Sequence, residues 1–324
     1  MLPGKTPDKY LMLKHVAVFC LCVLLTGTFF TAYAQNDSLV FANTKWRTKH
    51  IEKGIVLKEF WFHNSLFNSN QNISILEIKR NTKAVLELGY KRTLLQKTSV
   101  FAGKARAIAA INGSFFDIRN GGSVVYLRSN DSVINENRLN IGGKRLFYQK
   151  SALIFNKKRV AIEGWDGTEK WEGKLVGDVI LTGPLLVADS KPVYIDTTAF
   201  NRIRNPRSAI AATKNRILLI TVDGRNANAA GMSMYELQHL MQWLHSRDGT
   251  NLDGGGSTTL WVNSQPGNGV VNHPSDNKKL ENTVEFKSGV DPDTLPPDFE
   301  KWDHEGERKV ANVILVKKRK HHRK

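Results

Sequence analysis

Residues 208–224 read SAIAATKNRILLITVDG. Two apolar runs flank the polar pair Lys214-Asn215, which is the pattern of a β-hairpin. The second run ends at Asp223-Gly224, where a buried strand would deliver a polar side chain to the rim of a sheet. The hairpin therefore predicts a sheet-based domain whose functional groups lie at strand ends.

The rest of the chain carries the same strand-type patterning, with one clear exception. Further strand-like runs occupy residues 54–62, 72–79, 84–90, 105–116, 151–164, 178–187, 258–262 and 309–317. From Met234 to Ser246 the apolar residues fall on one helical face, and Ser233 with Glu236 forms an S-x-x-E capping box. Many strands and few helices without strict alternation predict an α+β fold, a single mixed, β-sheet-rich domain with a few helices.

Residues 1–34 have the features of a secretory signal peptide. Lysines precede an apolar run, and Ala32-Tyr33-Ala34 supplies a small-x-small cleavage pattern. Residues 35–50 form a polar lead-in, and residues 51–316 form the predicted domain. Cys20 and Cys22 both lie in the signal, so the exported chain would have no disulfide and no thiolate metal site. These features predict a periplasmic or extracellular protein of a bacterial envelope.

The formal net charge is +17, and part of the excess lies in the basic tail of residues 317–324, KKRKHHRK. On an exported protein such a tail would contact an anionic membrane or polymer, or remain solvated. Nucleic acid is not expected as a partner.

The stretch NLDGGGSTT, residues 251–259, is the strongest candidate for chemistry. It is neither a P-loop nor a dinucleotide-binding turn. The backbone amides of Gly254, Gly255 and Gly256 could converge on an anion, with the hydroxyl of Ser257 adding a donor. Asp253 would then lie beside a bound phosphate, where its pKa could suit proton transfer. The alternative is a tight turn capped by Asp253.

Other candidates lie at the start or end of strand-like runs or in separate polar segments. Asn112 and Asp117 close the run AIAAI, and Arg207 and Arg225 could bind phosphate in a bidentate manner or form surface ion pairs. His273, in the segment NHPSDN, is a further candidate. No metal-ligand spacing or calcium loop is present, so no cofactor is predicted, although aspartates could hold a divalent ion.

Taken together, these motifs resemble the phosphodiester glycosidase family. The matching segments are INGSFFD (111–117), TGPLLV (182–187), NPRSAIAAT (205–213), LLITVDGR (218–225), GMSMYEL (231–237), NLDGGGSTTLWVN (251–263), HPSDN (273–277) and ERKVANVILV (307–316). The resemblance spans about residues 109–316. It implies an α+β catalytic domain that cuts the bond between a sugar's anomeric carbon and a phosphodiester. It also implies that Asn112, Asp117, Arg207, Asp223, Glu236, Asp253 and the three glycines gather near one pocket.

Glycosidic bond cleavage needs charge neutralisation at the leaving oxygen and a carboxylate near the anomeric carbon. A phosphate is already a good leaving group, so Asp253 is the first candidate to activate water or attack carbon, followed by Asp223 and Asp117. Glu236 has a second interpretation as the capping-box residue. The expected partner is a phosphorylated carbohydrate or an anionic envelope glycan. The alternative function is a non-catalytic module that binds such glycans.

Overall fold

The computed structural model describes residues 37–140, 142–156, 159–276 and 302–319. The chain divides into two compact units, Met1–Thr44 and Lys45–Lys324. In the first unit the described residues begin with a helical stretch at 37–42. The predicted signal peptide and most of the basic tail lie outside the described residues. Among the residues that are described, no helix is long and apolar enough to cross a membrane.

The largest sheet of the second unit has eight strands, and its neighbouring strands pair antiparallel throughout. In spatial order these strands are β1 (Arg47–Glu52), β2 (Ile55–Phe62), β3 (Gln71–Lys79), β15 (Arg216–Val222), β14 (Arg207–Ala212), β16 (Asp248–Asn251), β12 (Leu185–Ala188) and β13 (Lys191–Pro192). The β14–β15 pair is the hairpin predicted from residues 208–224.

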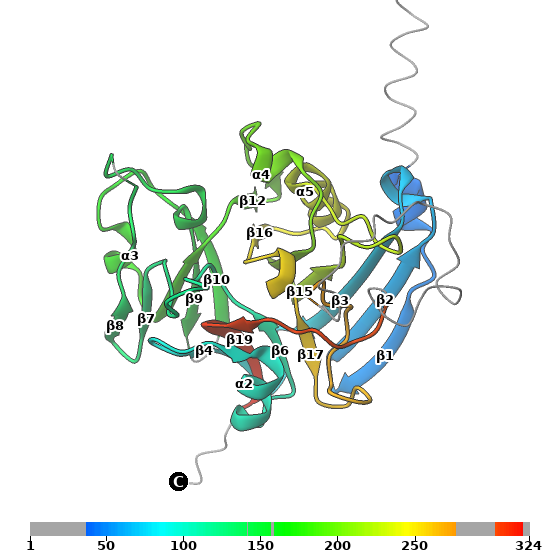
Figure 1. Ribbon diagram of the computed structural model, residues 1–324, viewed down its shortest axis with the longest axis horizontal. Coiled ribbons are helices and arrows are strands. Elements are labelled where there is room, and N and C mark those ends of the chain that lie inside the picture. The colour runs from blue at the N-terminus through cyan, green and yellow to red at the C-terminus, as the bar shows by residue number, and fades with distance from the viewer. Residues whose placement is uncertain (1–36, 141, 157–158, 277–301, 320–324) are drawn as a thin grey trace, which may run out of the picture. The chain divides into compact units, whose positions relative to one another are not determined.

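Two smaller sheets complete the framework, together with a short pair (Figure 1). The five-stranded sheet contains β10 (Arg159–Gly164), β9 (Ser151–Asn156), β11 (Asp178–Thr182), β7 (Leu127–Ser129) and β8 (Ser132–Asn135). The four-stranded sheet contains β17 (Leu260–Val262), β6 (Ala109–Asn112), β19 (Asn312–Lys318) and β4 (Ala84–Tyr90). The short pair is β18 (Lys309–Val310) with β5 (Gln96–Lys97).

Helices are short in the described part of the second unit. They are α2 (Thr98–Ala105), α3 (Trp171–Lys174), α4 (Ala199–Arg202) and α5 (Met234–Trp243), with 3-10 turns η1 (Leu66–Asn68), η2 (Phe147–Gln149) and η3 (Gly255–Ser257). The capping box of α5 is present as predicted. The helix ends three residues before the predicted Ser246, because His245 turns left-handed with φ of 53° and stops the helical hydrogen bonding.

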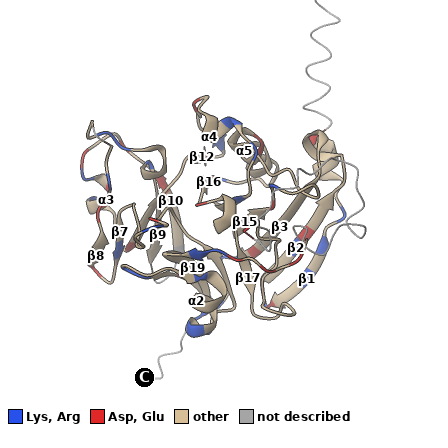
Figure 2. Cartoon of the chain, in the orientation of Figure 1, with Lys and Arg blue, Asp and Glu red and all other residues tan. Residues whose placement is uncertain are grey.

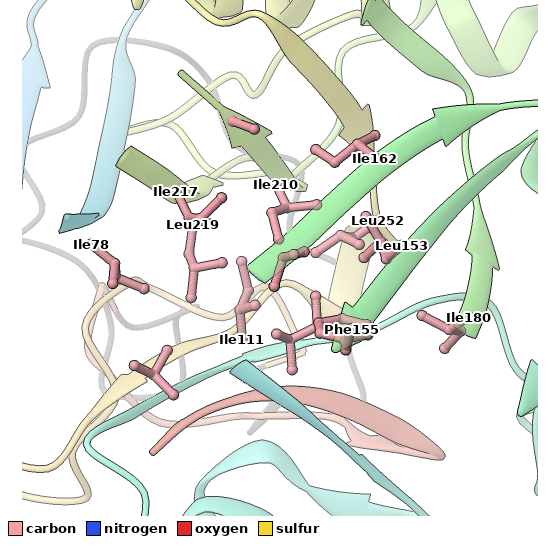
Figure 3. Close-up of a cluster of buried hydrophobic side chains, with 14 of the residues drawn as sticks. Ile78, Ile111, Leu153, Phe155, Ile162, Ile180, Ile210, Ile217, Leu219 and Leu252 are labelled. Carbon is pink, nitrogen blue, oxygen red and sulfur yellow. The ribbon is translucent and has the colours of Figure 1, made fainter. Parts of the chain in front are cut away.

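One hydrophobic core joins the three main sheets (Figure 3). Ile210 and Leu219 come from the eight-stranded sheet, Leu153 and Ile180 from the five-stranded sheet, and Ile111 from the four-stranded sheet. All five are at most 1% exposed. Burial of such side chains is the main stabilising contribution to a domain of this kind, and here it fixes the sheets against one another.

The predicted α+β class is confirmed by this sheet-rich architecture. Strand β1 begins at Arg47, inside the range interpreted as a polar lead-in. Its start was not predicted, because its alternate residues face solvent and leave little apolar pattern to detect. The break at Gly183-Pro184 separates β11 from β12, and these two strands belong to different sheets.

Candidate active site

The start of β14 and the ends of β15 and β16 lie together at one end of the eight-stranded sheet, where its strands begin or finish. In the β14–β15 pair, Arg207 at the start of β14 faces Val222 at the end of β15. In the β14–β16 pair, Ala209 faces Asn251 at the end of β16. Because both neighbours of β14 run antiparallel to it, the residues that follow β15 and β16 emerge at the same edge. This arrangement brings Asp223 and Asp253 to a common rim.

The glycine stretch is the crossover between two sheets. The chain leaves the eight-stranded sheet at β16 and enters the four-stranded sheet at β17, with η3 between them (Figure 1). Asn112, at the end of β6, fixes this crossover. Its Nδ2 donates to the Asp253 carbonyl (2.7 Å), and its Oδ1 accepts from Ser208 Oγ (2.6 Å) and Thr259 N (3.1 Å). Asn112 is fully buried, so its contacts hold the turn in place.

Two of the three glycine amides are already hydrogen-bonded within the protein. Gly254 N donates to Asp253 Oδ1 (3.0 Å), and Gly255 N donates to the Pro206 carbonyl (2.8 Å). The amide of Gly256 donates to no other described residue, so it is the amide left for a bound group. The predicted anion-binding nest is therefore reduced to one backbone donor.

The second and third glycines are required by close neighbours. Gly255 has φ of +61°, and a Cβ there would lie 3.1 Å from Arg225 Nη2. A Cβ on Gly256 would lie 2.2 Å from Asp276 Oδ1 and 2.3 Å from Arg308 Nη2. The turn thus lies directly against two guanidinium groups.

Asp253 is a half-buried residue at this turn. Burial raises its pKa to about 6, although the nearby Ser257 hydroxyl, the Arg308 charge and the Gly254 amide each favour the ionised form. Ser257 Oγ lies close to the carboxylate without hydrogen-bond geometry, and among the described residues it has no hydrogen-bond partner. Asp253 is therefore poised to change protonation state near neutral pH.

Asp223 is the second acidic group at the rim, and it is 1% exposed. Its Oδ2 accepts from Asn72 Nδ2 (2.8 Å) and His273 N (3.0 Å), and its Oδ1 accepts from Asn272 Nδ2 (3.0 Å). Burial raises its pKa to about 6 despite these three donors. Asn272 Nδ2 also donates to the Thr258 carbonyl (3.1 Å), which links Asp223 to the end of the glycine turn.

The two predicted arginines lie in different environments. Arg225 is exposed, and its Nε and Nη2 donate to Asn205 Oδ1 at 3.1 and 2.9 Å. Arg207 is 2% exposed, and it donates to the carbonyls of Met232 (2.7 Å), Phe200 (3.0 Å) and Ile203 (2.8 Å). Burial, with the nearby Arg225 charge, lowers the Arg207 pKa to about 10. Arg207 thus fastens α4 to the start of α5, and its predicted clamp role has no support in this geometry.

Asp117 lies in a turn of its own. It accepts from the amides of Arg119 and Asn120 and from the side chains of Asn120 and Arg138, at 2.9 to 3.0 Å. These bonds, those of Asn120 first, hold its pKa far below the usual range. A carboxylate so occupied is poorly suited to proton transfer.

Glu236 has the structural role that its capping-box pattern predicts. Its Oε2 accepts from Ser233 N (2.8 Å), and its Oε1 accepts from Arg204 Nε (2.9 Å). Oε2 thus caps the start of α5, while Oε1 is taken up by Arg204. His273 does lie at the rim, through its backbone contact with Asp223, and its ring stacks on Trp302.

Sequence reasoning missed four residues of this site: Asn72, Asn272, Asp276 and Arg308. Each of them lies within or next to a strand-like run or a segment that resembles the family. Its distance along the sequence from other polar residues, however, does not indicate which residue it contacts in the fold. Within the described ranges, no cluster of three or more His, Cys, Asp or Glu side chains could hold a metal ion.

Comparison with known proteins gives the family of the chain and relatives of its fold. A model of the phosphodiester glycosidase family matches residues 105–290. The chain is 28% identical over 189 residues to the SPbeta prophage-derived uncharacterized protein YomE of Bacillus subtilis, a match that covers 54% of this chain and 27% of that protein.

Two solved structures share the fold. The catalytic domain of zebrafish N-acetylglucosamine-1-phosphodiester alpha-N-acetylglucosaminidase, auto-inhibited by its pro-peptide, has a TM-score of 0.57 and 17% identity over 84% of this chain and 87% of that chain. A hypothetical protein from Synechocystis has a TM-score of 0.55 and 16% identity over 84% of this chain and 64% of that chain. The family match covers more than half of the sequence, so the chain belongs to the phosphodiester glycosidase family.

Proposed function

We propose that the protein is a glycosidase that hydrolyses the bond between a sugar's anomeric carbon and a phosphodiester. The observation that carries this proposal is the position of Asp253 on the glycine turn. It is half-buried, its pKa is raised to about 6, and Arg225 and Arg308 lie against Gly255 and Gly256 of the same turn. Membership of the family supports the reaction class. In the reaction, the bond between the anomeric carbon and the phosphate oxygen breaks, and its electron pair stays on the phosphate oxygen. The oxygen of water bonds to that carbon, and the proton that water loses passes to the phosphomonoester or to solvent.

Asp253 acts at the anomeric carbon in this proposal. In its ionised form it either removes a proton from the attacking water or attacks the carbon directly, and it stabilises the positive charge that develops there. The backbone of its turn is held on both sides, by Asn112 Nδ2 at the Asp253 carbonyl and by the Gly113 carbonyl at the Asp253 amide (3.0 Å). Such fixed positioning is what a carboxylate needs to act without reorganisation.

The leaving phosphate is stabilised by Arg225 and by the amide of Gly256. Arg225 is exposed, and its guanidinium lies over Gly255, so it can reach a group bound at the turn. A guanidinium offers two parallel N–H donors to phosphate oxygens. Because this charge neutralisation is electrostatic, protonation of the leaving oxygen is less necessary.

Asp223 acts as a positioning residue. It is buried, and it orients Asn72, Asn272 and the backbone of His273. Through Asn272 it also fixes the carbonyl of Thr258 at the end of the glycine turn.

The test is incubation of the full chain with a panel of sugar-1-phosphodiesters, with free reducing sugar and phosphomonoester measured together. The wild type should release both products in equal amounts. Asp253→Asn should lower kcat at least about a hundredfold, because the amide can neither accept the proton nor attack carbon. Asp189→Asn is the matched control, since Asp189 is an exposed aspartate with a side chain 82% exposed.

Equal activity in Asp253→Asn and the wild type would exclude Asp253 from the reaction. Saturable binding of the whole panel without release of either product would favour the non-catalytic, glycan-binding alternative.

A further inference from the structure

A second feature of the rim is an aromatic cavity of about 540 Å³. Its lining includes Phe60, Trp61, Asn72, His273, Trp302 and His304. Nothing in the reaction proposed above uses these aromatic side chains. The volume is within the range of pockets that hold small ligands, and aromatic walls with a few polar groups are typical of such pockets.

One wall of the aromatic cavity is a stack of three rings. The His273 ring lies 3.9 Å from Trp302 and 4.6 Å from His304, with interplanar angles of 16° and 21°. His273 Nδ1 is hydrogen-bonded to the Asp303 carbonyl (3.0 Å), and His304 Nδ1 to the Asn272 carbonyl (3.0 Å). Burial, with the adjacent His304, lowers the pKa of His273 to about 4, so this ring is neutral near pH 7. The wall is therefore held in place by these hydrogen bonds, and His273 adds no positive charge to it.

Trp61 extends the aromatic lining from strand β2. Trp61 is 46% exposed, which is unusual for a residue with so large an apolar ring. Its Nε1 nevertheless donates to the Asn228 carbonyl (2.8 Å), so the ring is held in one orientation. A fixed and exposed tryptophan offers a flat face to a ligand at a small entropic cost.

Polar groups lie around these aromatic faces. Asn72 donates to Asp223, while its Oδ1 accepts no hydrogen bond from another described residue. Lys45 and Arg47 also line the cavity, and Arg47 pairs with Glu59 at 2.9 Å. Both signs of charge occur on the β1–β2 hairpin (Figure 2). Such a lining combines aromatic faces with donors, acceptors and positive charge.

The aromatic cavity adjoins the candidate active site through shared chain segments. Residues 272–276 and 302–308 lie side by side, because His304 bonds to Asn272 near one end and Arg308 pairs with Asp276 near the other. The end at Asn272 and His304 carries the ring stack of the cavity, and the end at Asp276 and Arg308 lies against Gly256. A substrate could thus occupy both places.

We propose that the aromatic cavity binds a pyranose ring that carries an anionic substituent, as a glycan subsite of the proposed glycosidase. The C–H face of a pyranose packs on the electron-rich face of an aromatic ring, and its hydroxyl groups both donate and accept. Asn72 Oδ1 and Glu59 supply acceptors for those hydroxyls. Lys45 and Arg47 supply the positive charge for a carboxylate or phosphate. The inference rests on the proposed function for the identity of the ligand.

The test uses the full chain carrying Asp253→Asn, titrated with glucuronic acid, glucose and uridine and followed by NMR. Glucuronic acid should bind saturably and more tightly than glucose, and uridine should bind least. Trp61→Ala should raise the Kd for glucuronic acid at least about tenfold, whereas Trp61→Phe, which keeps a ring, should raise it less. Arg47→Ala should remove the preference for glucuronic acid over glucose.

Trp165→Ala is the control, because Trp165 lies outside the aromatic cavity and is packed near Arg145 and Lys150. Unchanged binding in Trp61→Ala, or tighter binding of uridine than of glucuronic acid, would overturn the subsite. If the wild type and Trp61→Ala hydrolyse the phosphodiester with the same kinetic constants, the subsite alone is rejected. Binding of glucuronic acid that depends on Trp61, without hydrolysis of any phosphodiester, would reject the hydrolase and leave the sugar site standing.

Discussion

Arg308 holds Asp276 with two hydrogen bonds, from Nε to Oδ2 at 2.6 Å and from Nη2 to Oδ1 at 3.0 Å. This ion pair occupies the space where a side chain on Gly256 would otherwise point. The Arg308 charge also favours the ionised form of Asp253. The pair therefore shapes the glycine turn and tunes the carboxyl group that the turn presents.

Arg308→Met should shift the pH dependence of hydrolysis. With Asp253 active as a carboxylate, kcat rises as the pH passes its pKa of about 6. Removal of the positive charge disfavours ionisation, so the pKa of Asp253 rises and the acidic limb moves to higher pH, by about one unit. The measurement is kcat from pH 4.5 to 8.5 for both proteins.

Arg308→Lys serves as the matched control, because it keeps the charge and should shift the acidic limb less. An identical limb in the wild type and in Arg308→Met would show that the titrating group is not Asp253.

Arg225→Lys should raise KM by roughly tenfold and leave the free energy of unfolding unchanged. Lysine keeps the charge but loses the two parallel donors that a phosphate accepts. Arg225 is exposed and donates only to Asn205 among the described residues, so the fold depends little on it. The measurement pairs steady-state kinetics with urea denaturation, and Arg247→Lys, with its side chain 66% exposed, is the control. A KM equal to that of the wild type would remove Arg225 from phosphate binding.

Arg207→Lys, in contrast, should lower the free energy of unfolding and leave KM unchanged. One ammonium group cannot reach the three carbonyls of Met232, Phe200 and Ile203 together, so buried acceptors lose their donors. We expect the free energy of unfolding to fall by about 2 to 4 kcal/mol, with KM unchanged in the folded fraction. Urea denaturation and steady-state kinetics on the same preparation check both values. A raised KM with unaltered stability would restore Arg207 as a phosphate clamp.

The sequence predicts this fold well because local patterns carry most of the information. The hairpin at residues 208–224 needs only two apolar runs and a polar turn, and the capping box of α5 needs only Ser233 and Glu236. Strand β1 escaped prediction because its pairing with β2, rather than its own composition, makes it a strand.

The site is less accessible to sequence reasoning, because its decisive contacts join distant segments. The position of Asp223 after a buried strand indicates a rim, but its bonds to Asn72 and Asn272 depend on which strands are neighbours. Likewise, Arg207 and Arg225 look equivalent in sequence. Only the position of Arg207 at the start of the central strand β14 buries it, while Arg225 lies beyond the end of β15.

Asp223→Asn should flatten the dependence of stability on pH. In the folded protein burial raises the pKa of Asp223 to about 6, while in the unfolded chain it is close to 3.8. Between these values the folded state binds more protons than the unfolded state, so the contribution of Asp223 to stability falls as the pH rises. Above about pH 6 the full cost of holding a buried carboxylate is present. The amide does not titrate, so the variant lacks this contribution at every pH.

The measurement is urea denaturation of the wild type and of Asp223→Asn at pH 4, 5, 6 and 7. The variant also loses an acceptor for Asn72, Asn272 or His273 N, so it should be less stable than the wild type at pH 4. The difference between the two proteins should then move in favour of the variant by pH 7, by on the order of 3 kcal/mol.

Asp253 is present in both proteins, so its own contribution cancels. If the difference in free energy of unfolding between the two proteins is constant across this range, Asp223 has the same pKa in the folded and unfolded chains. That result would remove the physical basis for its role as a buried positioning residue.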